Sequence, residues 1–595
     1  MQPSIIGSLF FVISFVALFV AVHLFQKSQR PQNRIVWLAL DFISILCWGT
    51  LVGGIIDIFR IPINLWSMGA VYLLSAIGLG VYLYKTRKFQ KYYFEKFDII
   101  YTVIFTVIIF LIGGSIVGPH IKLSYFNSDA AAHLKNTMNV VRSGHLPTMY
   151  MTELHNSMII EVFMPFIAEV NIYKIFILID AFFFLLETVF FMMVIRDYLD
   201  TKAMKVIGII ICLLYTLGYP LNSYLFSFLY WGVGVMLIVY LLYFIRLYQN
   251  NEVDSKYAIF IMMLGCNAVT QCYMLFGPFT YVAVFIALLL VQKQRGKLFT
   301  WANVKLALAV FAIPTVMSVY YCYFRFLQEM QMSVGDVISI SGGIYADVYI
   351  NFMWILPFIV YEFIKQVRNK KLDEVMICFL TFFVVTIVLG CLVLKGKVSY
   401  YYFYKSYYPM WTTGFIITVK AVRTIWKNSK EILMGFASVF VVIAFMNFSG
   451  YENYLISTGT GIQNTNKSAN LFDLYNYNRY IYSLSGPMMP DEYLDACNYV
   501  IENIDDEEVV PMLATIHNYS SCYWYEAITG EDCSSYYGWE NEDVELLCKK
   551  MENDGIKHFV VYTDSIMYAG NAAVFNDRYQ MEYKNDRVIV YVIGD

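Results

Sequence analysis

The sequence predicts an α-helical polytopic membrane protein of about fourteen transmembrane helices with a carboxyl-terminal α/β domain. Of its 595 residues, 59% are apolar and only 15% are charged, whereas soluble domains are about 45–50% apolar and about 25% charged. Residues 1–448 carry 34 Lys and Arg against 21 Asp and Glu, but residues 449–595 carry 8 against 24. This composition excludes a soluble globular enzyme, a disordered protein and a nucleic-acid binder that depends on a basic surface.

Apolar runs of membrane-spanning length recur through the basic part of the chain. A helix needs about 17–25 apolar residues to cross the hydrocarbon layer. Fourteen such runs are expected, near 4–25, 35–57, 62–84, 99–118, 173–195, 206–222, 228–246, 257–272, 275–292, 304–325, 348–364, 375–394, 407–420 and 431–448.

The charges of the connecting loops predict the orientation of these helices. Cytoplasmic loops are enriched in Lys and Arg, and seven alternate loops hold 25 of the 34 basic residues of this part. The alternation places the amino terminus, the 119–172 loop and the acidic tail outside the cytoplasm. We therefore expect a three-helix module at 1–98, a membrane core at 99–448 and an extracytoplasmic domain at 449–595.

The tail has the patterning of a mixed α/β domain. Amphipathic stretches at 491–503 and 541–553 predict helices. Short runs rich in β-branched and aromatic residues predict strands at Val509–Ala514, Phe559–Tyr562, Tyr579–Tyr583 and Val588–Ile593.

Four cysteines lie in this tail: Cys497, Cys522, Cys533 and Cys548. An exterior location permits disulfides, and the short separation of Cys522 from Cys533 allows one to close a loop there. No pair of closely spaced CxxC motifs is present, so a structural zinc site is not expected.

The long exterior loop at 119–172 holds the first set of candidate catalytic residues. Asn127 or Ser128 is a suitable helix cap, and an amphipathic helix is expected from there to Gly144. Asp129 and His133 are four residues apart, so a helix presents them on one face. The alternative is that Asp129 only caps the helix. Secondary candidates in the same loop are Glu153, His155 and Glu161.

The outer loop at 394–409 holds the second set, because Lys395, Lys397 and Lys405 lie there within a run of tyrosines that includes Tyr402. Positive charges at headgroup depth on the exterior side suit a lipid-linked phosphate. The alternative is an aromatic belt with snorkelling lysines. Arg325, at an outer helix end, is a weaker member of this set.

Three carboxylates lie within expected spans, at Asp41, Asp180 and Glu187. Charge is costly there, so each should have a functional or packing partner. Asp180 and Glu187 share a helix face and are suited to hydrogen bonding within the bundle. Three scattered carboxylates do not form the relay of a proton-driven pump.

The Ser128-Asp129…His133 and Lys395…Lys405 stretches, together with this layout, resemble the GT-C class of polytopic glycosyltransferases. The resemblance implies inverting sugar transfer from a polyprenyl-phosphate-linked donor to a glycan, lipid or protein acceptor. Asp129 would be the general base, His133 would orient it or bind phosphate, and Lys395, Lys397, Lys405, Arg325 and Tyr402 would bind the lipid phosphate. No metal ligand or cofactor is assigned, although a divalent cation is compatible with the class.

Other functions are compatible with parts of this pattern. An O-antigen-type polymerase or ligase also uses lipid-linked sugars, but it relies on a long exterior loop late in the chain. A transporter would favour paired repeats and broken helices at mid-membrane, and a nonenzymatic assembly protein would expose the tail to partners. The sequence is rich in Ile, Asn, Lys and Tyr, which indicates an AT-rich genome, and it shows no organelle signal. Both observations favour a bacterial plasma membrane.

Overall fold

The computed structural model describes ten stretches of the chain and a few positions between 430 and 482. These stretches are residues 4–28, 36–86, 95–122, 129–296, 300–327, 354–427, 490–505, 508–513, 519–536 and 543–594. Most of the expected span at 431–448, and the expected caps Asn127 and Ser128, lie outside the described residues.

Long helices dominate the amino-terminal three quarters of the chain. They are α1 (Ile5–Ser28), α2 (Val36–Ile58), α3 (Leu65–Thr86), α4 (Lys96–Val117), α5 (Asp129–Ser143), α6 (Met151–Phe163), α7 (Ile172–Ile195), α8 (Lys202–Leu217), α9 (Tyr219–Leu225), α10 (Leu229–Gln249), α11 (Ser255–Cys272), α12 (Phe276–Gln294), α13 (Trp301–Ser318), α16 (Leu356–Arg368), α17 (Glu374–Leu394), α18 (Tyr400–Lys405) and α19 (Tyr407–Lys427).

Ten helical segments of the described chain are long and apolar enough to cross a membrane, as expected of a multi-pass membrane protein. The expected spans at 257–272 and 407–420 coincide with α11 and α19, and the span at 348–364 overlaps α16, although its residues 348–353 lie outside the described residues. None of these three helices is among the ten. The described part of α16 has only 13 residues, or about 20 Å of helix. The last turns of α19 carry Lys420, Arg423 and Lys427. The part of the chain that the structure describes therefore supports a polytopic helical fold, and the count of fourteen spans stays a prediction.

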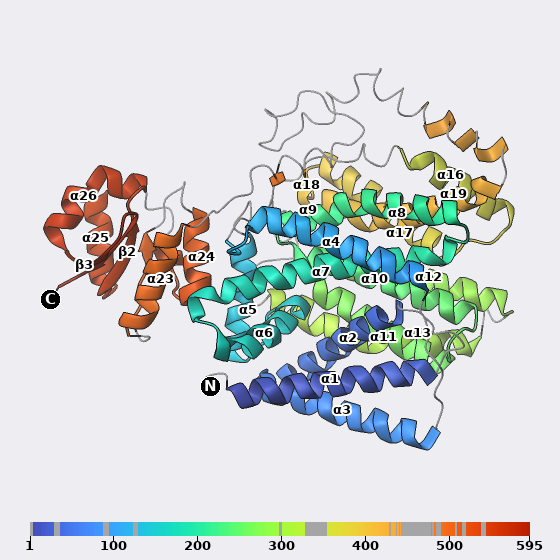
Figure 1. The fold of residues 1–595 in the computed structure, drawn as a ribbon, viewed down its shortest axis with the longest axis horizontal. Coiled ribbons are helices and arrows are strands. Elements are labelled where there is room, and N and C mark those ends of the chain that lie inside the picture. The colour runs from blue at the N-terminus through green and yellow to red at the C-terminus, as the bar shows by residue number, and fades with distance from the viewer. Residues whose placement is uncertain are drawn as a thin grey trace.

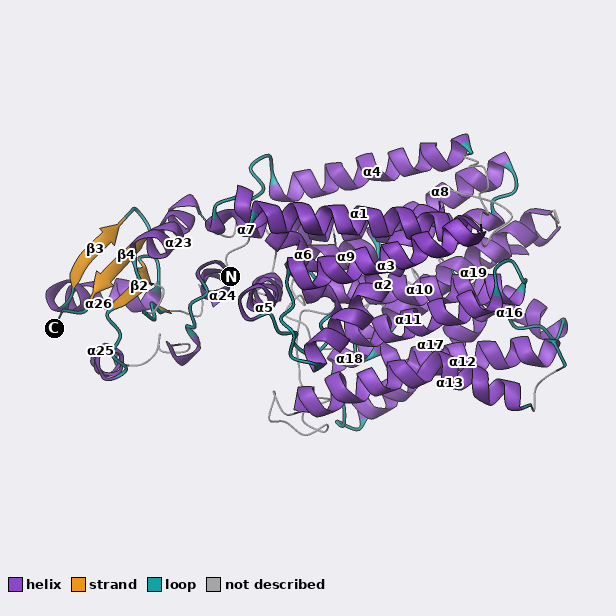
Figure 2. Ribbon diagram, turned by 90° about the horizontal axis from the view of Figure 1, so that it is seen from below, coloured by secondary structure: helices purple, strands orange, loops and turns teal. Residues whose placement is uncertain are grey.

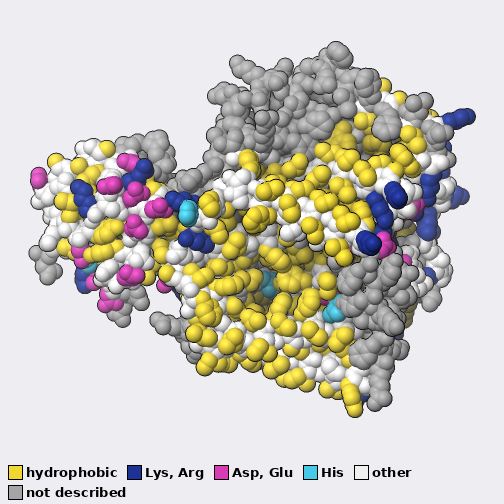
Figure 3. Space-filling model, viewed as in Figure 1, with side chains coloured by type: hydrophobic (Ala, Val, Ile, Leu, Met, Phe, Trp, Pro, Cys, Tyr) yellow, Lys and Arg dark blue, Asp and Glu magenta, His cyan; other side chains and the backbone are white. Residues whose placement is uncertain are grey.

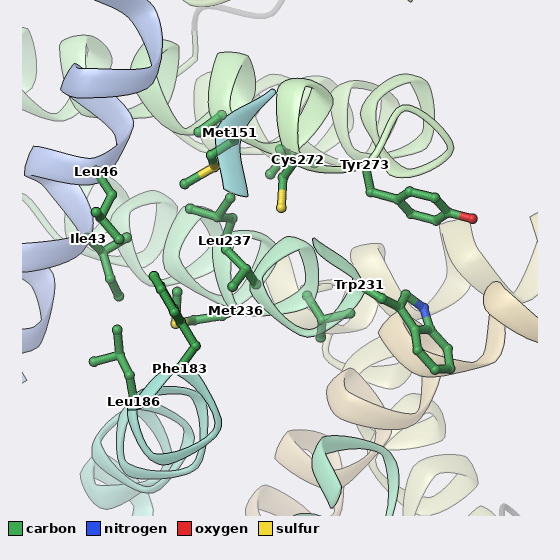
Figure 4. Packing of buried hydrophobic residues seen from close by; sticks show 14 of the residues in the cluster. Ile43, Leu46, Met151, Phe183, Leu186, Trp231, Met236, Leu237, Cys272 and Tyr273 are labelled. Carbon is green, nitrogen blue, oxygen red and sulfur yellow. The ribbon is translucent and has the colours of Figure 1, made fainter. Parts of the chain in front are cut away.

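Helix α2 lies in the middle of the bundle, whereas α1 and α3 pack together on its outer side (Figure 1). Ile43 and Leu46 of α2 point toward Phe183 of α7 and Leu237 of α10 (Figure 4). All four side chains are almost completely buried. The second helix of the expected amino-terminal module thus packs inside the helix bundle.

The outer helices present apolar side chains where a bilayer would surround the bundle. Ile99, Val103, Phe110 and Leu111 of α4 are largely exposed, and a continuous apolar surface covers this face (Figure 3). Removing such a surface from water is strongly favourable, at roughly 25 cal/mol per Å². Contact with lipid therefore accounts for exposed apolar side chains that would be unfavourable in water on a soluble protein.

The carboxyl-terminal part contains a four-stranded sheet with helices on both sides (Figure 2). Its strands β1 (Met512–Leu513), β2 (His558–Tyr562), β3 (Gln580–Lys584) and β4 (Val588–Val592) lie in the order β1-β2-β4-β3. β1 pairs with β2 in parallel, and the other two pairs are antiparallel. Its main helices are α23 (Asp491–Asn503), α24 (Tyr519–Thr529), α25 (Val544–Asn553) and α26 (Ile566–Arg578).

The sequence anticipated three of these strands to within one or two residues, whereas helix α26 was not expected. Alternate residues of β2 and β4 enter two separate cores. Val560 and Val590 belong to the large core that includes α23 and α24, and Phe559 and Tyr591 belong to a smaller one with α25 and α26. This alternation follows from the two-residue period of a strand. The cysteines are free thiols in the structure, so Cys522 and Cys533 do not form the disulfide that their spacing allowed.

Candidate functional site

The first candidate set lies on helix α5, which begins at Asp129 and ends before Gly144. Gly144 has φ +67°, the left-handed conformation that commonly ends a helix. Ala130, Ala131 and Leu134 are buried, so they fix which face of α5 packs inward. Asp129 and His133 are half-buried at the edge of that face.

His133 meets an acidic residue of the next helix. Its Nδ1 lies 3.5 Å from Oε1 of Glu153 on α6, and the Glu153 side chain is almost completely buried. The hydroxyl of Thr152 donates a hydrogen bond to the other carboxylate oxygen at 2.8 Å. A carboxylate beside a histidine favours the tautomer that carries a proton on the facing nitrogen, here Nδ1. Glu153 thus joins the candidate site through His133.

Lys405, from the second candidate set, is the last residue of α18 and is fully buried. Its Nζ donates hydrogen bonds to the hydroxyls of Tyr230 and Tyr401, both at 2.6 Å. Aromatic rings surround the ammonium group at 4.1–6.0 Å from their centroids: Phe228, Tyr230, Trp231, Tyr273 and Tyr401. Cation–π attraction and two hydrogen bonds offset the loss of hydration of this charge. We call these five rings the Lys405 cage.

Tyr230 connects the two candidate sets. Its ring lies 5.0 Å from the imidazole of His133, and its hydroxyl accepts from Lys405. Burial lowers the pKa of Lys405 well below its usual range, and the Asp129 carboxylate opposes this shift. The start of α5, the start of α10 and the end of α18 therefore converge, with Trp231 and Tyr273 beside one another in the bundle (Figure 4).

This cluster combines the groups that a group-transfer reaction needs. Asp129 is a half-buried carboxylate that can accept a proton. His133 and Glu153 form a polar pair beside it. The buried charge of Lys405 creates a positive potential behind two tyrosine hydroxyls, and such preorganised charge stabilises an anion that develops in a low-dielectric site.

Other members of the second set lie elsewhere. Lys395 and Lys397 are exposed in the turn after α17. Tyr402 is half-buried and packs edge-on against Tyr401 of the Lys405 cage, with ring centroids 5.0 Å apart. The structure therefore brings Lys405 to the Asp129 helix, but it leaves the other two lysines on the surface.

Arg325 is engaged with a carboxylate that the sequence analysis did not single out. It ends a π-helical segment, Val319–Arg325, and its guanidinium lies 2.5 Å from Oδ2 of Asp57, which is buried. The hydroxyl of Tyr321 donates to the same oxygen at 2.8 Å. The backbone N–H of Leu146 donates to the other oxygen at 3.1 Å. These contacts indicate that Asp57, on α2, holds both the π-helical segment that ends at Arg325 and the loop after α5.

Two secondary candidates on α6 have structural partners. Nε2 of His155 lies 2.9 Å from the Leu46 carbonyl oxygen and 3.2 Å from the Thr50 hydroxyl, both on α2. Burial lowers the pKa of His155 to about 4. Oε2 of Glu161 accepts from the backbone N–H of Leu65 at the start of α3, and burial raises the pKa of Glu161 to about 7. Neither residue contacts the Lys405 cage in the interactions described.

The carboxylates within the spans are hydrogen-bonded inside the bundle, as the shared face of Asp180 and Glu187 suggested. Asp180 accepts from Ser227, and Glu187 accepts from Tyr215 at 2.9 Å and from Tyr408. Asp41 is paired with His23. These contacts provide the packing partners that buried charge requires.

Sequence reasoning missed the aromatic members of the Lys405 cage on α10 and at the end of α11. The aromatic residues at 228, 230 and 231 sit at the start of an apolar run, where an interfacial belt is the ordinary interpretation. Within the described residues, no group of three or more His, Cys, Asp and Glu side chains could hold a metal ion.

No protein-family model matches the chain, and no curated protein sequence matches it. Solved structures similar to it include ArnT from Cupriavidus metallidurans in the apo state, with 13% identity and a TM-score of 0.44 over 83% of this chain and 97% of that chain. ArnT bound to undecaprenyl phosphate is similar with 14% identity and a TM-score of 0.44, over 83% and 98% of the two chains.

The oligosaccharyltransferase of Archaeoglobus fulgidus in the apo form is similar with 10% identity and a TM-score of 0.44, over 83% of this chain and 74% of that chain. These structural neighbours are GT-C glycosyltransferases, the class that the sequence resembles.

Proposed function

We propose that this protein is a membrane glycosyltransferase that moves a sugar from a polyprenyl-phosphate donor to a cell-envelope acceptor at the exterior face. One observation carries the proposal. The half-buried carboxylate Asp129 lies one turn before His133 on α5, and the ring of His133 contacts Tyr230. The hydroxyl of Tyr230 accepts from the buried ammonium of Lys405, on α18 far along the sequence, and the Asp129 carboxylate acts electrostatically on that ammonium. A proton acceptor beside a positive potential suits a reaction that deprotonates a hydroxyl and releases a phosphate.

The proposed reaction is an inverting displacement. The acceptor hydroxyl oxygen forms a bond to the anomeric carbon of the sugar while the bond from that carbon to the lipid phosphate oxygen breaks. Asp129 accepts the hydroxyl proton, and the polyprenyl phosphate leaves with the electron pair of the broken bond. His133, held by Glu153 at 3.5 Å, orients Asp129 or binds phosphate. The Lys405 side of the cluster stabilises the leaving phosphate.

Lys395, Lys397 and Tyr402 lie beside the cluster and do not take part in the transfer step. Tyr402 packs against Tyr401 of the Lys405 cage. The two lysines are exposed near the start of α18, where they can attract a lipid phosphate before it reaches the cluster. Arg325 has no part in the reaction as proposed, because it pairs with Asp57 and lies over the ring of Tyr321.

Replacing Asp129 with asparagine tests the proposed base. The change keeps the size of the side chain and its ability to cap a helix, but it removes the proton acceptor. We expect transfer to fall by about 10²–10⁴-fold while the protein stays folded in the membrane. Purified full-length protein is incubated with a panel of polyprenyl-phosphate sugars, and release of polyprenyl phosphate is measured.

Asp577→Asn, on α26 of the carboxyl-terminal domain, is a matched control that should leave the rate unchanged. If Asp129→Asn retained more than about half of the activity, Asp129 would be a helix cap and not the base. If the wild-type protein released no lipid phosphate from any of the donors, glycosyl transfer itself would be contradicted.

A further inference from the structure

The burial of Lys405 conflicts with direct contact between its ammonium and a substrate. Lys405 is 0% exposed, whereas the two tyrosines that accept its hydrogen bonds, Tyr230 and Tyr401, are only half-buried. Both hydroxyls lie 2.6 Å from Nζ. Any molecule that approaches Lys405 from the side of these tyrosines meets their rings and hydroxyls before it reaches the ammonium.

The direction of these hydrogen bonds determines where the tyrosine protons lie. Burial lowers the pKa of Lys405, but the nearby Asp129 carboxylate, two hydroxyl oxygens and five ring faces all favour the charged form. An ammonium group donates and cannot accept, so each tyrosine oxygen uses a lone pair toward Nζ. Each phenolic O–H bond must therefore point away from Lys405. A hydroxyl that accepts from a cation also becomes a stronger donor, because hydrogen bonds in series polarise one another in a low dielectric.

We propose that Tyr230 and Tyr401 donate the hydrogen bonds to the lipid phosphate, and that Lys405 is a positioning residue that orients and polarises both hydroxyls. This inference rests on the proposed function, since it names the groups that hold the leaving phosphate of that reaction. In this arrangement the Lys405 cage stabilises the ammonium charge and shields it from water. The ligand class is a phosphate monoester on an apolar chain.

Binding of a polyprenyl monophosphate to the purified full-length protein tests the inference without requiring turnover. Tyr230→Phe and Tyr401→Phe each remove one hydroxyl and keep the ring that faces the ammonium. Each should weaken binding about tenfold, the usual effect of losing one hydrogen bond to a charged group. Tyr400→Phe is the matched control, because it changes an exposed tyrosine of the same short helix and should bind normally.

A double-mutant cycle separates a positioning lysine from a direct ligand. Lys405→Met keeps the length of the side chain and the packing of the cage, but it removes the charge. If Lys405 acts through the tyrosines, this substitution weakens binding tenfold or more in the wild-type background and less than about threefold in the Tyr230→Phe/Tyr401→Phe background. If Lys405 contacts the phosphate directly, Lys405→Met weakens binding by the same factor in both backgrounds.

Three results would overturn the inference. They are normal binding by both tyrosine variants, an equal loss of binding from Lys405→Met in both backgrounds, and no binding of polyprenyl monophosphate by the wild-type protein. Should Lys405→Met not fold, the tyrosine variants alone decide, with tenfold losses supporting the inference and normal binding contradicting it. Binding that depends on the tyrosines in a protein with no transferase activity would refute the proposed function while leaving the phosphate site intact.

Discussion

Two neighbouring polar residues of α6 have different partners because they lie on different faces of the helix. Glu153 and His155 are two residues apart, and residues with that spacing point about 200° apart around a helix. Glu153 therefore meets His133 of the candidate site, whereas His155 contacts the Leu46 carbonyl and the Thr50 hydroxyl. His155 is a buried packing histidine.

The depressed pKa of His155 predicts a pH-dependent stability. Burial lowers this pKa to about 4 in the folded protein, from an ordinary value of 6.5. Between these values the unfolded chain binds more protons than the folded one, so stability falls as the pH is lowered from 6.5 toward 4. The decrease should reach about 1.4 kcal/mol per pH unit.

Thermal unfolding of the detergent-solubilised protein at pH 7.5 and pH 5 measures this effect. His155→Gln keeps a hydrogen-bond donor but cannot titrate, so its melting temperature should change less between the two conditions than that of the wild type. An identical change in both proteins would show that other groups carry the pH dependence.

Two helices far apart in the sequence, α5 and α24, contact each other where the membrane part meets the carboxyl-terminal domain. Nζ of Lys135 on α5 lies 3.0 Å from Oε2 of Glu526 on α24, and the Glu526 side chain is fully buried. The other carboxylate oxygen accepts from the backbone N–H of Cys533 at 2.8 Å. Because α5 also carries Asp129, the domain supports the helix that bears the proposed base.

Lys135→Met should loosen this contact, because it leaves the buried Glu526 carboxylate without that cation. Lys135 is 31% exposed, so we expect a cost of about 1–3 kcal/mol, below the figure for a fully buried pair. Hydrogen–deuterium exchange should become faster in both residues 129–143 and residues 519–529.

Lys122→Met is the control for this prediction. Lys122 pairs with Asp491 at 2.9 Å, with exposures of 32% and 69% for the two side chains, and such pairs contribute only about 0–1 kcal/mol. Equal exchange in the two variants would mean that the Lys135–Glu526 pair does not hold the domain in place.

On the scale of the whole molecule, the carboxyl-terminal domain lies at one end of the helix bundle. Figure 3 shows many Lys and Arg side chains gathered at the other end. Ion pairs join charged residues of the loops expected in the cytoplasm, such as Lys420 with Asp373 and Arg246 with Asp197. The positive-inside rule assigns that basic end to the cytoplasm, which supports an exterior location for the domain and for the Asp129 cluster.

Reporter fusions test this orientation. An alkaline phosphatase joined after Asp595 should be active, because this enzyme folds only outside the cytoplasm. The same reporter placed in the turn at 369–373, after α16, should be inactive. The reverse pattern would invert the topology and place the proposed reaction on the cytoplasmic face.

The sequence by itself determined the properties that depend on local composition and spacing. Apolar runs must form helices in a membrane because their backbone groups have no other partners there, so the long helices could be placed to within a few residues. The four-residue spacing of Asp129 and His133 put both on one face of α5. The strands of the tail followed from short runs rich in β-branched and aromatic residues.

Only the tertiary structure decided which distant residues meet. Lys395, Lys397 and Lys405 looked equivalent in the sequence, yet packing of α18 against α10 buries only the last of them in an aromatic cage. Arg325 meets Asp57 from a helix more than 260 positions earlier in the chain. Such partners depend on how the apolar faces of the helices fit together, and hydropathy carries no information about that fit because nearly every residue in the core is equally apolar.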